Sequence, residues 1–567
     1  MNRNVESHFS QIPSADIQRS RFDRSQDVKF TFNVGELIPF FVEEVLPGDT
    51  FDIESSKVVR LQTLLTPVMD NIYLDTYWFF VPNRLVWSHW KNFMGEADQA
   101  WRPSQEYSVP RISFSDTGEA SGTGGSNESG SILDYMGVPL ISEITDFGVA
   151  ETQVNALPLR AYDLIYSEWF RDENLIDPVN VNISDSTTYW DLRTQKTPYK
   201  VSKYHDVFTS CLPAPQRGPS VAVPVYQSDG KSIPVSTGKD AHSASGYSLF
   251  GKYNSLSDLE KVSGRLYPGS YGHSLEGPFP VNLSINDSPN TSGFEPTNLY
   301  ASINANGVGI GINDLRYAIQ VQKFYEALAR GGSRYIEIIA QMFNVTSPDA
   351  RMQRPEYLGG NRVPISIHQI TNQSQGENDF LGDLGAMSLT TDRHADFVKS
   401  FTEHGFIIGL VCARYDHSYP QGLEKFWMRK DKFNYYWPVF ANLGEEAVFK
   451  EEIYFTGHPN QQADVVTAYK VFGYQERWYD YRYKPNRVAG EMRPGIVNTL
   501  DSWHFADYYT ESPTLSQSWI EEDQTNVDRT LAVTSAVSDQ IFCDIYVKNF
   551  ATRPLPMFSI PGLMDHH

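Results

Sequence analysis

Two segments near opposite ends of this chain alternate apolar and polar residues with the two-residue period of a half-buried β-strand. Valine and phenylalanine take every second position of residues 28–34, and isoleucine, cysteine and valine do so in residues 541–548. Apolar and aromatic runs lie between these segments, at residues 72–81 and 405–413. Strands at both ends of a sequence indicate one β domain that its terminal strands close.

The composition suits short strands that are joined by many turns. Aromatic residues make up 13% of the 567 residues, and 39 glycines and 33 prolines are spread along the chain. Aromatic side chains fill pleated cores, whereas Gly and Pro set the turns between strands. This composition disfavours a long helical protein, and the sequence predicts a mainly β fold.

Three segments have the periodicity of a helix instead. Residues 155–171 place apolar and aromatic side chains on one face. Residues 313–330 begin with the capping residues Asn313 and Asp314 and end at two glycines. A third helix is expected from Ser333 onward. The β domain therefore carries a few helices between its strands.

Residues 226–311 differ in character from the rest of the chain, since they hold 12 of its 39 glycines together with many Ser, Asn and Pro. An insert of this length is normally functional or disordered, and its scattered aromatics favour a folded piece. We expect it to interrupt a β domain of residues 28–225 and 312–567. Residues 1–27 are polar and are expected to form a flexible N-terminal arm.

The charge and the cysteines limit the class of protein. A formal net charge of −22 argues against a chain whose whole surface binds nucleic acid, although it leaves room for one basic face. The three cysteines are far apart and odd in number, which disfavours a disulfide framework and predicts buried thiols. No stretch resembles a signal peptide or approaches the ~20 apolar residues of a spanning helix. We expect a soluble protein without a cleavable signal.

No motif in the sequence specifies an enzyme. Residues 307–311 contain three glycines, but the further glycine and the Lys-Ser/Thr pair of a phosphate-binding loop are missing. His394 and His404 have acids nearby, yet their spacing is poor for a metal, and surface histidines are the simpler interpretation. No pair among the 69 acids stands out as a glycosidase pair. We expect no catalytic residues, no cofactor and no metal.

One stretch suggests binding chemistry, because residues 477–487 interleave cations with aromatic rings. Rings stack on bases and cations follow phosphates, so this stretch could contact single-stranded DNA. The alternative, which we favour, is a strand whose aromatic face packs inward and whose basic face contacts another subunit. The candidate residues for either contact are Arg477, Trp478, Tyr481, Arg482, Tyr483, Lys484 and Arg487.

Several longer sequence motifs occur in a fixed order that spans nearly the whole chain. They are Asn155–Tyr162, Glu168–Asp172, His205–Gln216, Ala329–Tyr335, Ser347–Asp349, Gln353–Gly360, Phe472–Arg477, Asp501–His504 and Pro561–His566. Each closely resembles the corresponding motif of gokushovirus major capsid proteins in the Microviridae.

This resemblance implies an eight-stranded antiparallel jelly-roll β-barrel with long loop insertions. It further implies pentamers that assemble into a T=1 icosahedral shell around circular single-stranded DNA. The expected partners are a small basic DNA-binding protein, a minor DNA-pilot protein and a receptor on the host cell surface. The expected location is the virion, after assembly in the bacterial host cytoplasm.

The resemblance also implies that residues 226–311 build a protrusion at the three-fold axes that serves host attachment. Its candidate host-contact residues are the aromatics Tyr247, Phe250, Tyr253, Tyr267 and Tyr271. A shell of copies that each carry −22 cannot neutralise a packaged polyanion, so counterions or the basic protein must help.

Two other classes of protein would share part of this pattern. A β-sandwich carbohydrate-binding or carbohydrate-active protein would have similar aromatics and turns, but the missing signal peptide and the lack of a distinctive acid pair count against it. A separate receptor-binding spike would explain the insert and leave the long flanking β domain unexplained.

Overall fold

The structure is a computed structural model, and most of what it describes lies outside the predicted insert. The described residues are 18–97, 106–114, 128–140, 152–190, 193, 195–219, 221, 235–237, 251–253, 294–296, 299–301, 312–373, 381–457 and 471–558. The chain divides into two compact units, one of residues 1–217 with 326–567 and one of residues 218–325. The first unit holds the β domain.

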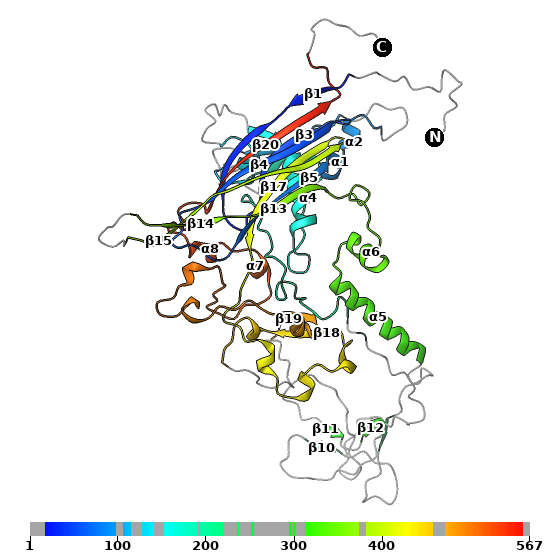
Figure 1. Cartoon of the computed structure of the whole chain (residues 1–567). Coiled ribbons are helices and arrows are strands. Elements are labelled where there is room, and N and C mark those ends of the chain that lie inside the picture. Colours follow the sequence, from blue (N-terminus) through cyan, green and yellow to red (C-terminus); the bar gives the residue numbers. More distant parts are fainter. Residues whose placement is uncertain are drawn as a thin grey trace, which may run out of the picture. The chain divides into compact units, whose positions relative to one another are not determined.

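Two antiparallel sheets form the β domain (Figure 1). The first sheet contains, in spatial order, β2 (Gln26–Phe32), β20 (Ile541–Arg553), β4 (Thr50–Leu61) and β16 (Thr390–Ser400). The second contains β3 (Ile38–Val45), β17 (Gly405–Tyr415), β5 (Ile72–Pro82) and β13 (Glu356–Pro364). The pairing is nested: β2 pairs with β20, β3 with β17, β4 with β16 and β5 with β13. Nested pairing across two antiparallel sheets is the arrangement of a jelly roll, as predicted.

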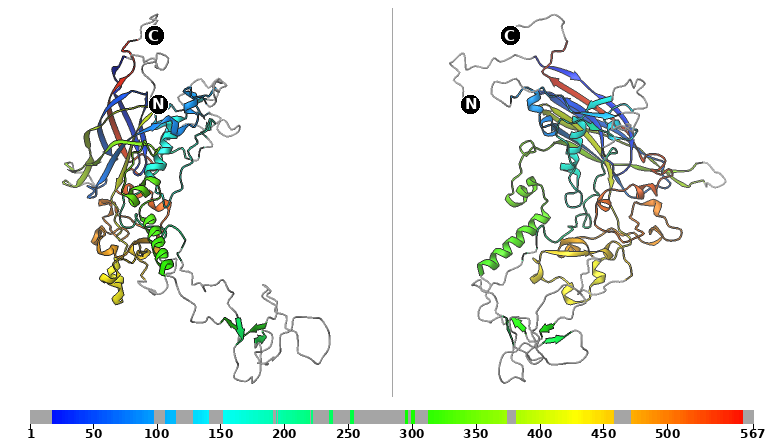
Figure 2. Two further views of the ribbon diagram at one scale, coloured as in Figure 1. Left: turned by 90° about the vertical axis from the view of Figure 1, so that its right-hand side faces the viewer. Right: turned by 180° about the vertical axis from the view of Figure 1, so that it is seen from behind.

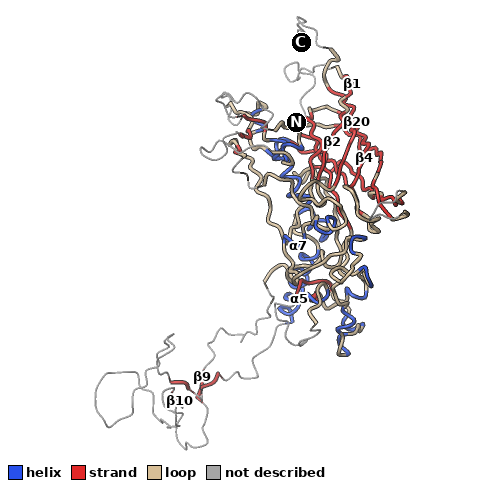
Figure 3. The backbone as a smooth tube through the Cα atoms, turned by 90° about the vertical axis from the view of Figure 1, so that its left-hand side faces the viewer, coloured by secondary structure: helices blue, strands red, loops and turns tan. Residues whose placement is uncertain are grey.

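The first sheet also includes β1 (Ser20–Asp23), which lies along the same edge of β20 as β2 (Figure 3). Between the two strands, the backbone N–H of Arg24 donates to the carbonyl oxygen of Asn549 at 2.8 Å. The prediction of a flexible arm up to residue 27 is therefore wrong from Ser20 onward, because the 13-residue β20 is long enough to pair with both strands. Residues 1–17 lie outside the described residues.

The core between the two sheets is built from large rings. Trp78 of β5 is fully buried and makes edge contacts with the rings of Phe40, Phe41 and Phe397, with centroids 5.4, 5.3 and 5.9 Å away. β20 buries every second residue from Ile541 to Ala551, which confirms the alternation of its sequence.

The second sheet is covered on its outer face as well. All residues of β17 except Arg414 are buried, and they alternate between the sandwich core and a second apolar cluster. Helix α4 (Leu157–Ile165), continued by the π-helical turn Tyr166–Phe170, packs in this second cluster (Figure 2). The helix predicted for residues 155–171 is thus confirmed, and it forms a third layer.

Shorter elements occupy the loops of the first unit. The helices are α1 (Asn83–Val86), α2 (Trp90–Phe93), α3 (Ile132–Tyr135), α7 (Gln517–Ile520) and α8 (Thr525–Asp528). The small sheets are β7 (Thr152–Asn155) with β6 (Arg111–Phe114) and β8 (Thr188–Tyr189), β14 (Ile367–Thr371) with β15 (Leu384–Ser388), and β18 (Glu445–Phe449) with β19 (Val471–Glu476). Every described helix is too short or too polar to cross a membrane. Cys211, Cys412 and Cys543 are free and buried, as predicted.

The second unit contains two short strand pairs. β9 (Val235–Thr237) pairs with β12 (Leu299–Ala301), and β10 (Gly251–Tyr253) pairs with β11 (Phe294–Pro296). Of the candidate host-contact aromatics, Tyr253 lies in β10, whereas Tyr247, Phe250, Tyr267 and Tyr271 lie outside the described residues. The boundaries of the insert at 226 and 311 stay predictions.

The two later helices are also present, as α5 (Ile312–Arg330) and α6 (Tyr335–Phe343). The apolar side chains that give residues 313–330 their helical periodicity are not all buried in α5, since Leu315 is 40% and Ile319 46% exposed. At the start of α6, the guanidinium of Arg334 donates to the carbonyl oxygens of Ser167 and Arg171 at 3.0 and 3.2 Å. This residue therefore ties α6 to the π-helical turn of the third layer.

A buried histidine joins the loop after β17 to the C-terminal part of the chain. His417 Nδ1 lies 2.9 Å from Asp507 Oδ1, and Nε2 lies 3.0 Å from Glu522 Oε1. Burial by itself lowers the pKa of the imidazole, but the two carboxylates outweigh burial and raise this pKa to about 10. Burial raises the pKa of Asp507, but the charge of His417 outweighs burial and lowers this pKa to about 2. The imidazole is therefore charged at neutral pH and paired on both sides.

Replacing His417 with Gln should lower the free energy of unfolding by about 3 kcal/mol near pH 6, because two buried carboxylates lose their shared cation. The pKa of His417 is higher in the folded protein than in the unfolded chain, where it is about 6.5. The stabilisation by the charged imidazole is therefore complete below pH 6.5 and is lost as the pH rises toward 10. The difference in the free energy of unfolding between wild type and variant should therefore shrink between about pH 6.5 and pH 10, as measured by urea denaturation of the unassembled subunit. His205→Gln, at an exposed histidine, is the control. A difference that does not change with pH would contradict this assignment.

Candidate assembly and nucleic-acid surface

The candidate residues 477–487 do not continue the strand that precedes them. β19 ends at Glu476, and the N–H of Arg477 donates to the carbonyl oxygen of Gly444 in the turn before β18, at 3.1 Å. Trp478 then adopts a left-handed backbone with φ of 68°, and a 3-10 turn follows over Tyr479–Tyr481. The prediction of a strand through this stretch is therefore wrong, since the left-handed residue turns the chain away from the sheet.

The rings of this stretch have different environments. Trp478 is buried, and its Nε1 donates to the carbonyl oxygen of Phe440 at 3.0 Å. Tyr483 is half-buried, and burial raises its pKa to about 12. Tyr481 is 50% exposed. Of the three predicted rings, Tyr481 is thus the most exposed, and it is the one that a base or a partner side chain can reach.

A buried polar cluster lies beneath these rings. Lys425 forms an ion pair with Glu446, and its Nζ lies 3.4 Å from the hydroxyl of Tyr479 and 4.5 Å from the centre of that ring. The Tyr479 hydroxyl in turn donates to both carboxylate oxygens of Glu452 at 2.6 and 2.7 Å. Burial lowers the pKa of Lys425 and raises the pKa of Glu452. The cluster holds the segment that begins at residue 424 against the candidate stretch.

Most of the predicted cations already have acidic partners in the chain. Arg482 is paired with Glu476, and Lys484 with Glu424. The Nε of Arg477 lies 3.9 Å from Glu446 Oε2. Arg487 is exposed, and among the described residues it has no ion pair. The positive charge of the stretch is largely neutralised within the subunit.

The structure adds a second segment that the sequence analysis missed. Residues 424–443 pack beside the candidate stretch in three short 3-10 turns, Lys425–Met428, Lys432–Asn434 and Pro438–Phe440. Together with Tyr481, its exposed rings form what we call the aromatic surface: Phe426, Trp427, Phe433, Tyr435, Tyr436 and Trp437. Trp427 is 68% exposed. The signal in the sequence is six rings within residues 426–437, at a spacing that fits neither a helix nor a strand.

The two segments are joined at their exposed side as well. The N–H of Tyr436 donates to the Tyr481 hydroxyl at 3.2 Å, and Arg429 forms an ion pair with Asp480 while lying 4.4 Å from the Tyr481 ring. A cavity of about 630 Å³ lies between the segments. Residues 424–443 and 477–493 together hold nine Lys or Arg and four Asp or Glu, so this surface is basic in a chain of net charge −22.

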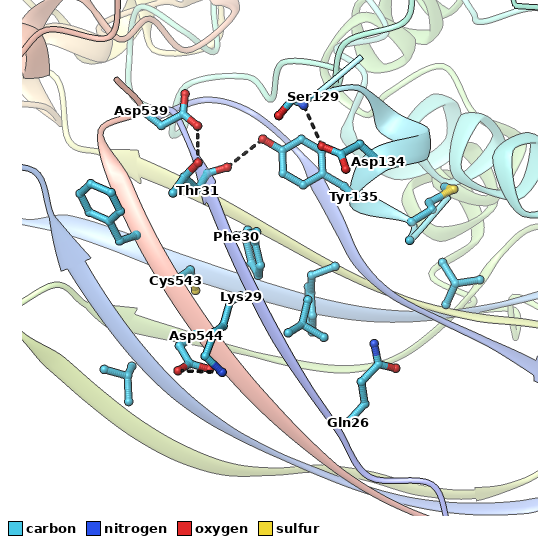
Figure 4. Close-up of a pocket in the computed structure, with 18 of the residues that line it drawn as sticks. Gln26, Lys29, Phe30, Thr31, Ser129, Asp134, Tyr135, Asp539, Cys543 and Asp544 are labelled. Atoms are coloured by element: carbon cyan, nitrogen blue, oxygen red, sulfur yellow. Dashed lines mark hydrogen bonds and ion pairs between the residues drawn. The ribbon is translucent and has the colours of Figure 1, made fainter. Parts of the chain in front are cut away.

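Another cavity, of about 930 Å³, lies at the corner of the jelly roll between the edge strands β2 and β3 (Figure 4). Tyr135 of α3 partly covers it, and its hydroxyl donates to the carbonyl oxygen of Thr31 at 2.8 Å. Phe30 packs against this ring edge-on, with centroids 6.3 Å apart. In this lining the Thr31 hydroxyl donates to the carboxylate of Asp539, and nowhere in the described residues do three His, Cys, Asp or Glu side chains gather to hold a metal.

Comparisons with known proteins bear on the whole chain. Residues 10–563 match the family described as capsid protein (F protein). The chain is 38% identical to capsid protein VP1 of Chlamydia phage 1, with 99% of this chain and 98% of that protein aligned. It is 36% identical to capsid protein VP1 of Bdellovibrio phage phiMH2K, over 99% and 98% of the two chains. Capsid protein VP1 of Spiroplasma virus 4 is also 36% identical, over 98% and 97%.

Replacing Lys425 with Met should loosen residues 424–443, because the half-buried Glu446 and the buried Glu452 lose their nearby cation. We expect chymotrypsin to cut this segment at least about tenfold faster than in the wild type, while the jelly roll stays intact. Lys432→Met removes an exposed lysine of the same segment and is the control. Equal rates of cleavage in both variants would show that the buried cluster does not anchor the segment.

Proposed function

The chain belongs to the phage capsid protein (F protein) family, and from this premise we propose that many copies of it close into a T=1 icosahedral shell around circular single-stranded DNA. It is a structural capsid protein of the Microviridae and not an enzyme. It self-assembles into the shell of the virion. The match over residues 10–563, together with the nested jelly roll, carries this proposal.

The charge of the chain supports the proposed partners. Copies of net charge −22 repel a packaged polyanion, so counterions or a small basic DNA-binding protein must help to neutralise the genome. A minor DNA-pilot protein, pentamers as assembly units and assembly in the bacterial cytoplasm complete the proposal. These features follow from the resemblance to gokushovirus capsid proteins.

We infer that the aromatic surface is a contact between subunits. Contiguous exposed apolar patches mark interaction sites, and aromatic residues are enriched at the centre of protein interfaces. Arg482 and Lys484 already have acidic partners, so they offer little unpaired charge to a phosphate. A surface of exposed rings on which Arg482 and Lys484 are already paired therefore suits a protein partner better than a nucleic acid.

The second candidate for this surface is single-stranded DNA. Tyr481 is exposed beside Arg482, and Arg487 has no ion pair within the described part of the chain. A ring that is flanked by cations is the arrangement on which bases stack and along which phosphates lie. Arg477, Trp478 and Tyr483 would then act by supporting the exposed residues, because Trp478 is buried and Tyr483 half-buried.

We propose that the inserted segment 226–311 forms a protrusion at the three-fold axes that attaches to a host receptor. The described strands within it pair only with each other, β9 with β12 and β10 with β11, which supports a separate piece. The candidate contact residues remain Tyr247, Phe250, Tyr253, Tyr267 and Tyr271.

Replacing Trp427 and Trp437 together with Ala should prevent assembly while the subunit stays folded. Each exposed ring that becomes buried at a contact contributes about 2 kcal/mol, so the fraction of protein in particles should fall at least about tenfold. Sedimentation velocity measures this fraction, and circular dichroism checks the fold.

Replacing Arg482 and Lys484 together with Gln separates the two candidates for the surface. We expect particles that contain genome in the normal amount, as measured by the ratio of absorbance at 260 and 280 nm. Particles that form but lack genome would favour the DNA contact instead. Normal assembly of the Trp427 and Trp437 variant would rule out the subunit contact.

Replacing residues 230–305 with a short Gly/Ser linker should leave a soluble subunit, because both partners of each described strand pair are removed together. The melting temperature should stay within about 3 °C of the wild type. The resulting particles should no longer attach to host cells. A chain that carries the same linker beside the intact insert is the control, and loss of soluble protein would argue against a separate surface piece.

A further inference from the structure

The hairpin of β14 and β15 projects from one end of the jelly roll (Figure 1). Within the described residues, no third strand joins it, apart from a single bridge between Leu64 and Ala386 in the middle of β15. At the base of the hairpin, the N–H of Ser366 donates to the Thr390 hydroxyl at 2.7 Å. Beyond Ile367, every residue of β14 is exposed.

This hairpin carries apolar side chains on both of its faces. The register places Ile370 opposite Gly385 and His368 opposite Met387, so Ile370 and Met387 share one face. Ile370 is 42% and Met387 45% exposed. Leu384, on the other face, is 42% exposed. An isolated two-stranded hairpin is marginally stable in water, and of the apolar side chains of this one, Ile367 and Ala386 pack against the sandwich core while Ile370, Leu384 and Met387 stay exposed.

The charges of the chain indicate what covers the hairpin. The two strands contain no Asp, Glu, Lys or Arg, although the chain has 69 acids and 47 basic residues. Two copies that each carry −22 repel each other, and the repulsion is smallest where the approaching element has no charge. Proteins that avoid pairing between strand edges place Lys or Pro on them, and neither residue occurs in β14 or β15.

We propose that the β14–β15 hairpin binds a second copy of this chain, to which it presents a free strand edge and the apolar side chains of Ile370, Leu384 and Met387. Strand addition of this kind gains main-chain hydrogen bonds together with pockets for alternate side chains. The inference rests on the proposed shell, since it names one element through which neighbouring subunits hold each other. It is independent of the aromatic surface, which lies in a different part of the first unit.

The test is the double variant Ile370→Lys and Met387→Lys, which places two charges on one face of the hairpin. Both side chains are exposed in the single subunit, so the melting temperature should not change. The fraction of protein in particles, measured by sedimentation velocity, should fall at least about tenfold. The matched control is Val398→Lys with Val537→Lys, two valines that are 71% and 80% exposed elsewhere in the unit.

A second measurement uses the unmodified chain. Backbone amides of residues 367–371 and 384–388 should exchange hydrogen at least about tenfold more slowly in particles than in free subunits. Normal particles from the hairpin variant, or equal exchange in the two states, would overturn this inference and leave the shell itself untouched. Failure of the wild-type chain to form particles under any condition would instead overturn the proposed function. Loss of particles in the control variant as well would show that the effect is not specific to the hairpin.

Discussion

The fold depends on one strand, β17, whose sequence leaves no polar face. A strand with apolar side chains on both sides needs a layer above it and a layer below it. The first sheet supplies one layer, and α4 with its π-helical turn supplies the other. The one partly exposed residue of β17 is Arg414, which lies 2.6 Å from the buried carboxylate of Asp75 on β5. Arg362 of β13 lies 2.7 Å from the same carboxylate, so a single buried charge links three neighbouring strands.

Much of this fold can be predicted from local patterns in the sequence. The alternation at residues 541–548 and the apolar run at 405–413 give β20 and β17, because each pattern reports which faces of a strand are buried. Periodicity cannot say which strands pair, so the jelly roll was implied only by the resemblance to a known family, and the nested pairs are seen in the structure. β1 was missed because a four-residue strand with two charged side chains has no pattern of its own.

The candidate surface was only half predicted, for a different reason. The cations and rings of residues 477–487 indicate one part of the candidate surface, but their roles depend on contacts with residues that are distant in sequence. Arg482 and Lys484 are neutralised by Glu476 and Glu424, and Trp478 is buried by residues of the neighbouring segment. Residues 424–443 were missed because their rings lie in 3-10 turns, where side chains follow no simple repeat.

The nested pairing also determines at what stage of synthesis the fold of the subunit can be completed. β2 lies near the start of the chain, and its partner β20 is made about 500 residues later. Until β20 leaves the ribosome, the first sheet lacks the strand that joins β2 to β4. Pairs so distant in sequence close a domain slowly and late. A chain that ends before residue 541 therefore lacks the strand that completes the first sheet, and it cannot present a finished jelly roll to its neighbours.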